Sequence, residues 1–422
     1  MSRDRRPNPD RRWRIPPVPA HASHSFAGAV VLEELSGPAG FALWQAFRDV
    51  QLWSLAPPRE RSQLFAPGAA AARAVALDDP ELRAPLRVLL GMVERPTATQ
   101  VEEVAAACAA IARWAEAGGA IATAMAFAEA AAAAAPEDAP LAYEAGRLAR
   151  RRAEHGRAET WFLRAAGLGR RSGGWETYSA AWVGMGRIQM QKGNFPRARR
   201  HFLRALRAAR RHGLRVAEGQ ALQHLCGADG EAGDLAGAEA WAREAYRVWG
   251  PENVLVTRAV HDLAHIWSMQ GFSRRAQAVL QALLPHFDDP RDRLYVLSSI
   301  VRAAGAAGDR RAFAEAWSQA WELAGTPTAA DGCARAMLDM ARGAALIGEH
   351  ALAVEAAMRC IDAASGRREE AKSRLEAEAL LESLRTARDV GAAGAAVEAP
   401  FRDEAGDALA AEIIRGLSAA GA

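Results

Sequence analysis

The chain has 422 residues, a formal net charge of +3 and 50% hydrophobic residues. Because this charge is nearly balanced, the field of the whole molecule gives no argument for nucleic-acid binding. Abundant alanine favours closely packed helices. Only Lys192 and Lys372 are lysines, so patterns of arginine carry less weight in this chain than they would elsewhere.

The four cysteines, Cys108, Cys226, Cys333 and Cys360, lie far apart and form no C-x-x-C pair. This spacing is typical of small core residues in a reducing compartment. No uninterrupted apolar run is long enough to cross a membrane, and the basic start is not followed by the apolar segment of a secretion signal. The sequence therefore predicts a cytoplasmic protein with no membrane partner and no cofactor.

Residues 1–24 are rich in proline and arginine and have little apolar surface to bury. This composition predicts a disordered basic arm. The arginines around Trp13 are able to touch RNA or an acidic surface, although a solvated tail is the more common role of such an arm.

Residues 25–96 follow a different pattern, which predicts a separate N-terminal helical domain. Its clearest element is an amphipathic helix from about Phe41 to Leu55, and further helices are expected near 59–77 and 81–94. An enzyme in this segment is the weakest hypothesis, because it contains no evident pair of nucleophile and base.

Residues 179–206 read SAAWVGMGRIQMQKGNFPRARRHFLRAL and predict a helical hairpin. Trp182 lies on one face of the first helix, Gly193 ends that helix, and Ala198 and Phe202 share a face of the second. Small residues at the crossing allow the two helices to approach closely.

The same pattern recurs along the chain. The counterparts of Ala198 are Ala124, Ala158, Ala238, Ala276, Phe313 and Ala353. Each follows, by five residues, a predicted break at Gly119, Ala153, Gly233, Gly271, Gly308 or Gly348. Residues 97–366 are therefore expected to form seven hairpins.

The W, L-G, Y, A, F, A and P positions of this unit resemble the tetratricopeptide repeat (TPR) family, with Gln189 in place of one usual aromatic residue. The resemblance implies an all-α, right-handed α-solenoid. Residues 367–390 are then expected to form a capping helix with Leu375 and Leu384 facing inward, together with Leu380 and Leu381. Residues 391–422 are expected to form a linker and a short terminal helix.

Thr99 to Glu102 match the capping-box pattern at the start of the first repeat helix. Chemical motifs are otherwise scarce, because neither lysine lies in a phosphate-binding loop. His261 and His265 have the i, i+4 spacing of zinc ligands, and His224 is a conceivable third ligand. Metalloprotease spacing would need a glutamate after His261, so we expect no metal and no catalytic residues.

In the TPR family, positions on the first helix of each hairpin line a concave groove that holds a partner segment. The resemblance assigns to this groove one recurring position, occupied by Arg113, Arg147, Arg187, Gly227, His265, Arg302 and Arg342, and the neighbouring residues Tyr143, His261 and Tyr295. A nearly continuous basic ladder would attract an acidic segment.

Ion pairing within helices is the competing interpretation of this ladder. Glu144 and Asp339 lie three residues before a ladder position, and Glu116 lies three residues after one. Arg187 and Arg302 have no such acidic neighbour on their own helix, so they are the best candidates for direct contact with a partner.

The second helix of the third hairpin carries a stripe of Arg197, Arg200, Arg204, Arg207 and Arg211. Such a stripe can lie along phosphates, although a solvated convex face is the more common role. The sequence therefore predicts a noncatalytic scaffold or adaptor that binds a protein or peptide segment, of acidic character, in the groove. The alternative is a regulatory or nucleic-acid-associated protein that uses the basic arm and this arginine stripe.

Overall fold

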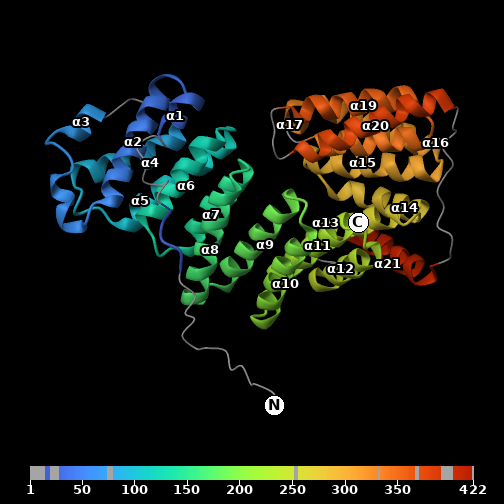
Figure 1. The fold of residues 1–422 in the computed structure, drawn as a ribbon, viewed down its shortest axis with the longest axis horizontal. Coiled ribbons are helices and arrows are strands. Elements are labelled where there is room, and N and C mark those ends of the chain that lie inside the picture. Colours follow the sequence, from blue (N-terminus) through green and yellow to red (C-terminus); the bar gives the residue numbers. More distant parts are fainter. Residues whose placement is uncertain are drawn as a thin grey trace, which may run out of the picture. The chain divides into compact units, whose positions relative to one another are not determined.

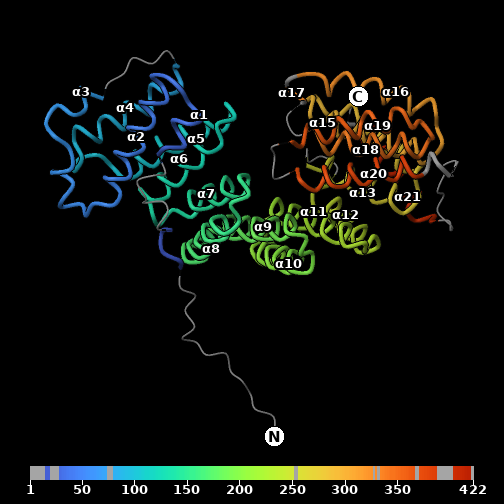
Figure 2. Tube along the Cα trace, turned by 45° about the horizontal axis from the view of Figure 1, so that its top comes forward, coloured from blue at the N-terminus to red at the C-terminus, as the bar shows by residue number. Residues whose placement is uncertain are grey.

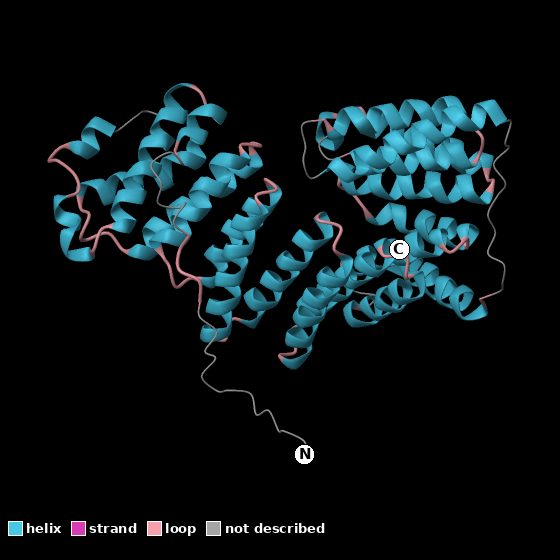
Figure 3. Ribbon diagram, viewed as in Figure 1, coloured by secondary structure: helices cyan, strands magenta, loops and turns pink. Residues whose placement is uncertain are grey.

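The computed structural model describes residues 15–19, 28–73, 79–250, 255–330, 333–365, 370–390 and 403–420. All regular secondary structure in these ranges is helical (Figure 3). The chain divides into two compact units. Unit 1 comprises Met1–Lys192 and Arg207–Gly213, and unit 2 comprises Gly193–Leu206 and Leu214–Ala422. None of the described helices combines the length and the apolar character needed to span a bilayer.

Unit 1 begins with a group of helices before the repeats (Figure 1). They are α1 (Ala29–Glu34), α2 (Gly37–Leu55), the 3₁₀ helix η2 (Pro58–Gln63), α3 (Ala69–Arg73) and α4 (Pro80–Glu94). Helices α2 and α4 confirm two of the three predicted helices. The continuous helix expected near 59–77 is wrong, because Gly68 has a φ of 78° and separates η2 from α3. Residues 74–78 lie outside the described ranges.

Seven helix pairs follow. They are α5 (Val101–Ala117) with α6 (Ile121–Ala134), α7 (Ala139–Arg151) with α8 (His155–Ser172), α9 (Trp175–Gln191) with α10 (Phe195–Arg211), α11 (Arg215–Glu231) with α12 (Leu235–Trp249), α13 (Val256–Met269) with α14 (Ser273–Leu283), α15 (Pro290–Ala307) with α16 (Arg310–Ala324), and α18 (Ala334–Leu346) with α19 (His350–Ala364). The short η3 (Leu284–His286) and α17 (Pro327–Ala330) lie in the connections.

One left-handed residue separates the two helices of every pair. The φ angles are 81° at Gly119, 57° at Ala153, 70° at Gly193, 84° at Gly233, 91° at Gly271, 72° at Gly308 and 85° at Gly348. A left-handed residue ends a helix, and glycine adopts this conformation without steric cost. All seven breaks expected from the sequence are therefore confirmed.

Successive hairpins pack side by side within each unit. In unit 1, α6 contacts α7 and α8 contacts α9, as the trace in Figure 2 shows for α6 to α8. In unit 2, α12 contacts α13, α14 contacts α15, and α15 also contacts α18. This order of contacts confirms an all-α solenoid of TPR-like hairpins.

Glycines allow close approaches within and between hairpins. A Cβ atom at Gly184 would lie 2.5 Å from the ring of Phe162, and one at Gly146 would lie 2.8 Å from the same ring. In unit 2, a Cβ atom at Gly343 would lie 2.5 Å from the carbonyl oxygen of Val301, so α15 and α18 meet backbone to backbone. The crossing of small residues expected from the repeat pattern is therefore present, with glycine at the tightest points.

The helices before the repeats cover the first hairpin. Helices α1 and α2 pack on α6, and α4 packs on α5. The Glu34 carboxylate accepts hydrogen bonds from the backbone amides of Ala122 and Thr123, at 2.8 and 2.7 Å. A carboxylate at this place satisfies free amides at the start of α6 and complements the helix dipole.

The capping box expected at the start of α5 is wrong. The N-cap residue is Gln100, with no side-chain cap bond. The Thr99 hydroxyl instead donates to the carbonyl oxygen of Arg95 at 3.1 Å, just after the end of α4. Thr99 therefore closes the preceding helix rather than opening the next one.

A short part of the predicted basic arm has a defined place on unit 1. The Arg164 guanidinium of α8 donates to the carbonyl oxygen of Pro16 at 2.5 Å. A Cβ atom at Gly167 would lie 2.9 Å from the Ile15 side chain. Residues 15–19 therefore differ from the expected free arm, and residues 1–14 and 20–24 lie outside the described ranges.

Two helices follow the repeats in unit 2. Helix α20 (Ala371–Val390) packs on α18 and α19, as expected for a capping helix. Ala377 and Leu384 face inward, but Leu375 is 65% exposed, so its predicted inward position is wrong. Ser373, two residues earlier, takes the buried place.

Helix α21 (Glu404–Ala420) packs back on α14, and four hairpin helices lie between the two in the chain (Figure 1). Arg275 of α14 donates to the Asp403 carboxylate at 2.8 Å and to the Asp403 carbonyl oxygen at 2.9 Å. It also donates to Asp407 at 2.8 Å. Arg275, whose side chain is only 6% exposed, thus joins the start of the terminal helix to α14.

Candidate functional site

The first helices of unit 1 bring together Tyr143, Arg147 and Arg187 of the predicted groove. The Arg147 guanidinium donates two hydrogen bonds to Glu116 of the preceding hairpin, both at 2.6 Å. It also donates to Glu144 at 2.7 Å. The hydrogen bond from Arg147 is the main reason that the pKa of Glu116 is lowered. The charge of Arg147, one position of the predicted ladder, is therefore neutralised by these two glutamates.

Glu116 does not pair with Arg113, which corrects one of the expected intrahelical pairs. Its second partner is Arg151, also in the next hairpin. Arg113 is exposed and forms no ion pair with the residues that the structure describes. The acidic residue thus links two hairpins rather than two turns of one helix.

Arg187 is the one cation near Tyr143 that keeps its charge available. Its side chain is exposed, and it forms no hydrogen bond or ion pair with any described residue. Protein around the guanidinium still removes part of its water, which lowers the pKa of Arg187, and the charge of Arg147 lowers it further. Tyr143 acts in the opposite direction. Arg187 is therefore in contact with solvent and interacts with a tyrosine.

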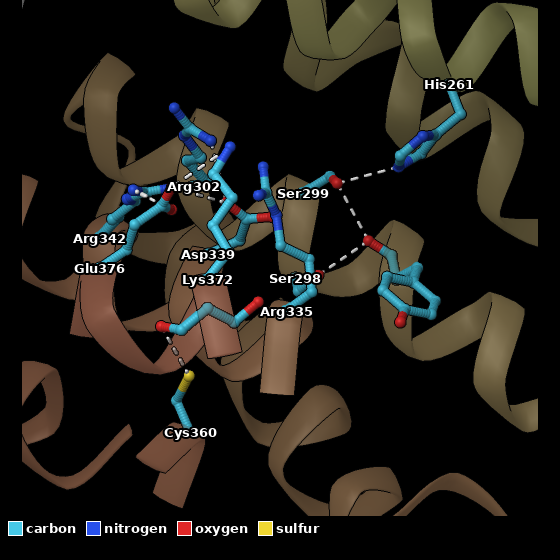
Figure 4. Close-up of polar contacts among 12 residues, drawn as sticks. His261, Ser298, Ser299, Arg302, Arg335, Asp339, Arg342, Cys360, Lys372 and Glu376 are labelled. Atoms are coloured by element: carbon cyan, nitrogen blue, oxygen red, sulfur yellow. Dashed lines mark hydrogen bonds and ion pairs between the residues drawn. The ribbon is translucent and has the colours of Figure 1, made fainter. Parts of the chain in front are cut away.

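Arg302, the second predicted contact residue, is already paired. Its guanidinium donates to the Asp339 carboxylate of the next hairpin at 2.9 Å (Figure 4). Arg335 reaches the same carboxylate at 3.3 Å, and Arg342 lies 3.7 Å from it. The expectation that Arg302 is without an acidic partner holds only within its own helix, because the partner comes from α18.

Asp339 is buried at the centre of these three arginines. Burial by itself would raise the pKa of Asp339, but the charges of Arg335 and Arg302 outweigh it and bring the pKa down to about 2. Arg335 was not assigned from the sequence to the groove. Its position four residues before Asp339 on α18 was the available signal.

Arg342, the last rung of the ladder, pairs with α20. Its guanidinium donates to the Glu376 carboxylate at 2.9 Å. The Lys372 ammonium lies 3.5 Å from the same carboxylate and also contacts Glu231 at the end of α11. Neither Lys372 nor Glu376 was assigned to the groove from the sequence, because both lie on the predicted capping helix.

His261, His265 and Tyr295 lie beside this cluster in unit 2. A hydrogen bond of 2.9 Å joins His261 Nε2 to the Ser299 hydroxyl, which also donates to the carbonyl oxygen of Tyr295 at 3.0 Å (Figure 4). Burial and the charges of Arg302 and Arg335 lower the pKa of His265 to about 3. His265 is therefore neutral at neutral pH and adds no charge to the ladder.

His224 has a different environment from these two histidines. Its ring stacks on Phe202 with centroids 5.2 Å apart. Within the described ranges, no group of three or more His, Cys, Asp or Glu side chains is placed to hold a metal ion. The four cysteines are all buried and form no disulfide, and burial raises the pKa of Cys108 and Cys360 to about 12.

The arginine stripe runs along α10. Arg197, Arg200, Arg207 and Arg211 are exposed, whereas Arg204 is half-buried. Arg199, which lies outside the stripe, pairs with Asp229 at 3.1 Å. The stripe is thus a largely solvated cationic surface of one helix.

Comparisons with known proteins give a fold and no sequence family. No family model matches the sequence, and no curated protein matches it. The crystal structure of a Rap protein complexed with Competence and Sporulation Factor is similar over 79% of this chain and 98% of its own, with a TM-score of 0.50 and 12% identity.

Two further solved structures align over most of their own length. The Rap conjugation gene regulator of plasmid pLS20, in complex with the Phr* peptide, has a TM-score of 0.41 and 13% identity over 88% of this chain and 99% of its own. The P58(IPK) TPR domain has a TM-score of 0.22 and 15% identity over 75% of this chain and 99% of its own. The order of hairpin contacts and the similarity to the first Rap structure define the fold as that of a TPR-like helical repeat protein.

Proposed function

We propose that this chain is a noncatalytic scaffold that binds a segment of another protein, and that Arg187 is the anchor of the binding site. The observation that carries the proposal is the exposed and unpaired guanidinium of Arg187, which lies beside Tyr143. Arg147, Arg302 and Arg342 are neutralised by acidic residues of neighbouring helices. Of the two ladder arginines without an ion pair among the described residues, Arg113 and Arg187, it is Arg187 that interacts with Tyr143, so an incoming carboxylate gains most at Arg187.

The chemistry of this site favours a single carboxylate over a long acidic run. An arginine guanidinium binds a carboxylate through two parallel hydrogen bonds, which are stronger than hydrogen bonds between neutral groups. The half-buried ring of Tyr143 offers an apolar surface next to that contact. The solved Rap complex, whose fold is similar, supports a binding role for hairpin repeats of this kind. The absence of a disulfide among the four cysteines supports a cytoplasmic location.

The test is binding of two labelled peptides to the full chain, followed by fluorescence anisotropy. One probe is hexaglutamate with both ends blocked, and the other is hexaserine with a free terminal carboxylate. We expect Arg187→Glu to weaken the better probe by at least about tenfold, because one charge-assisted contact is lost. The preferred probe tells whether the site reads a side-chain or a terminal carboxylate.

Arg170→Glu is the matched control. Arg170 lies in unit 1, is exposed and has no ion-pair partner among the described residues, so the substitution makes the same change in net charge. We expect it to alter affinity by less than about twofold. Equal losses in both variants, or no binding of either probe to the unmodified chain, would refute Arg187 as the anchor.

A second candidate function is association with nucleic acid, which the exposed arginines of α10 favour. Binding to mixed-sequence RNA that weakens steeply with salt, and that is lost in an Arg197→Glu/Arg200→Glu variant, would support it. Retention of RNA binding in that variant would exclude the stripe as the contact surface.

A further inference from the structure

The start of α20 makes polar contacts with three helices that are distant in sequence. Glu376 accepts from Arg342 of α18, and Lys372 contacts Glu231 of α11 (Figure 4 shows the first pair). The Lys372 ammonium also lies 5.8 Å from the ring centroid of Phe195, the first residue of α10. The first turns of α20 therefore join the last hairpin to the hairpins at the beginning of unit 2.

The ion pair between Glu376 and Arg342 is of the kind expected between a partner's carboxylate and the predicted groove. The sequence predicts that Arg342 attracts an acidic segment, and in the structure Glu376 supplies that carboxylate from the same chain. Lys372, four residues before Glu376, supplies a cation for the opposite acid, Glu231. A Lys-x-x-x-Glu segment of a helix thus pairs with Arg342 and with Glu231 at the same time.

The first turns of α20 are held less firmly than its later part. Lys372 is 50% exposed, and Glu376 and Arg342 are both partly exposed. Exposed ion pairs of this kind contribute little individually. Ser373 is buried and its carbonyl oxygen accepts from the Cys360 thiol at 3.6 Å, but the apolar anchors, Ala377 and Leu384, come later in the helix. The first turns are therefore able to leave while the later turns stay packed.

We propose that the start of α20, residues 371–376, is an internal ligand of the predicted groove in unit 2. Glu376 pairs with Arg342, the cation that a partner carboxylate needs. A partner segment therefore binds Arg342 only by displacing Glu376. The segment that competes best is a helix with a Lys-x-x-x-Glu pattern. The competition, although not the docking of α20 itself, rests on the proposed function.

Two paired variants of the full chain test the docking. Lys372→Ala/Glu376→Ala removes the contacts with α11 and α18. Arg374→Ala/Glu378→Ala removes an i, i+4 pair of the same type on the same helix, which forms no ion pair outside α20 with the described residues. Neither variant alters the net charge, and both remove one intrahelical pair, so only the contacts across the groove differ between them.

Amide hydrogen exchange of residues 371–378 is the first measurement. We expect exchange to become about 5- to 25-fold faster in Lys372→Ala/Glu376→Ala, the factor that two exposed ion pairs supply. Arg374→Ala/Glu378→Ala should differ from the unmodified chain by less than about threefold, the effect of one intrahelical pair. Equal acceleration in both variants would overturn the proposal, because loss of helix stability would then explain the effect.

Binding of blocked hexaglutamate is the second measurement, made in an Arg187→Glu background so that unit 1 does not contribute. We expect the Lys372→Ala/Glu376→Ala chain to bind at least about fivefold more tightly than its Arg374→Ala/Glu378→Ala counterpart, because Arg342 is released. Equal affinities would overturn the role of α20 as a competitor. The exchange measurement contains no ligand, so failure of the Arg187 site would leave its result intact.

Discussion

The Arg302 guanidinium donates a hydrogen bond to the Asp339 carboxylate at 2.9 Å and thereby joins α15 to α18. The same two helices cross at Gly343, where no side chain separates the backbones. Close backbone contact places the arginine and the aspartate of neighbouring hairpins within reach of each other. Because α15 and α18 pack this closely, Arg302 is paired with Asp339 and its charge is not available to a partner.

Acid should weaken the fold through Asp339. Its pKa is about 2 in the folded chain, against 3.8 for an ordinary aspartate, so its contribution is complete above pH 4 and is lost as the pH falls toward 2. We expect the free energy of unfolding of the unmodified chain to fall by about 2 kcal/mol over this range through this group alone. In Asp339→Asn this component should be absent, as urea denaturation at several pH values would show. An identical acid response in the variant would contradict the assignment.

Asp339→Asn should also destabilise the chain at neutral pH. Arg302 and Arg335 would lose the charge that compensates their burial, which typically costs about 3–5 kcal/mol. The same urea series measures this loss at pH 7. A change below about 1 kcal/mol would indicate that solvent replaces the carboxylate.

Glycine at the crossing of α15 and α18 should be essential. Gly343→Ala places a Cβ atom 2.5 Å from a backbone carbonyl oxygen, and backbone cannot rotate away, so we expect a loss of about 1–3 kcal/mol. Gly227→Ala is the control, because it too lies inside a helix of unit 2 and nothing lies within 4 Å of its added Cβ. That change should stabilise the chain by about 0.5–1 kcal/mol through helix propensity. In thermal unfolding, we expect the melting temperature to fall in Gly343→Ala and to rise in Gly227→Ala, relative to the unmodified chain.

The docking of α21 should depend on Gly406. A Cβ atom there would lie 2.2 Å from Arg275 Nη1 and 2.0 Å from Asp403 Oδ2. We expect Gly406→Ala to loosen α21, which hydrogen exchange of residues 404–420 would detect. Gly416→Ala on the same helix adds a Cβ with nothing within 4 Å and should leave exchange unchanged or slower. Similar exchange in both variants would show that Arg275 adapts without releasing the helix.

Substitutions at Phe202 and Arg187 should have different effects, the first on stability and the second on binding. Phe202 is 0% exposed, and Phe202→Ala should cost about 3–5 kcal/mol because it leaves a cavity. Arg187→Glu changes an exposed residue and should alter the free energy of unfolding by less than about 0.5 kcal/mol while it weakens the partner. Thermal unfolding in parallel with the peptide titration measures both. Destabilisation by both variants would argue against Arg187 as a binding residue.

The sequence by itself determined the hairpins, because their signals are local. Each break needs one residue in the left-handed conformation, and each helix shows its buried face through a period of 3.6 residues. Even Ala153, the single break without glycine, was placed correctly by its phase within the repeat. Phe202 and the buried cysteines follow from the same periodicity, since burial of a face is a property of the hairpin.

Only the tertiary structure decided which charges of the groove remain available. Glu116 pairs with Arg147 and Arg151 of the next hairpin, Asp339 pairs with Arg302, and Glu376 reaches Arg342 from a helix after the repeats. Each of these pairs spans more than 30 residues of sequence, whereas sequence periodicity reports neighbours three or four positions apart. Repeats place helices next to one another by their apolar faces, and the side-chain pairs across those contacts depend on how closely the helices cross. A ladder of like charges in the sequence has thus become, in the fold, a set of ion pairs that leaves Arg113 and Arg187 exposed and without an ion pair among the described residues.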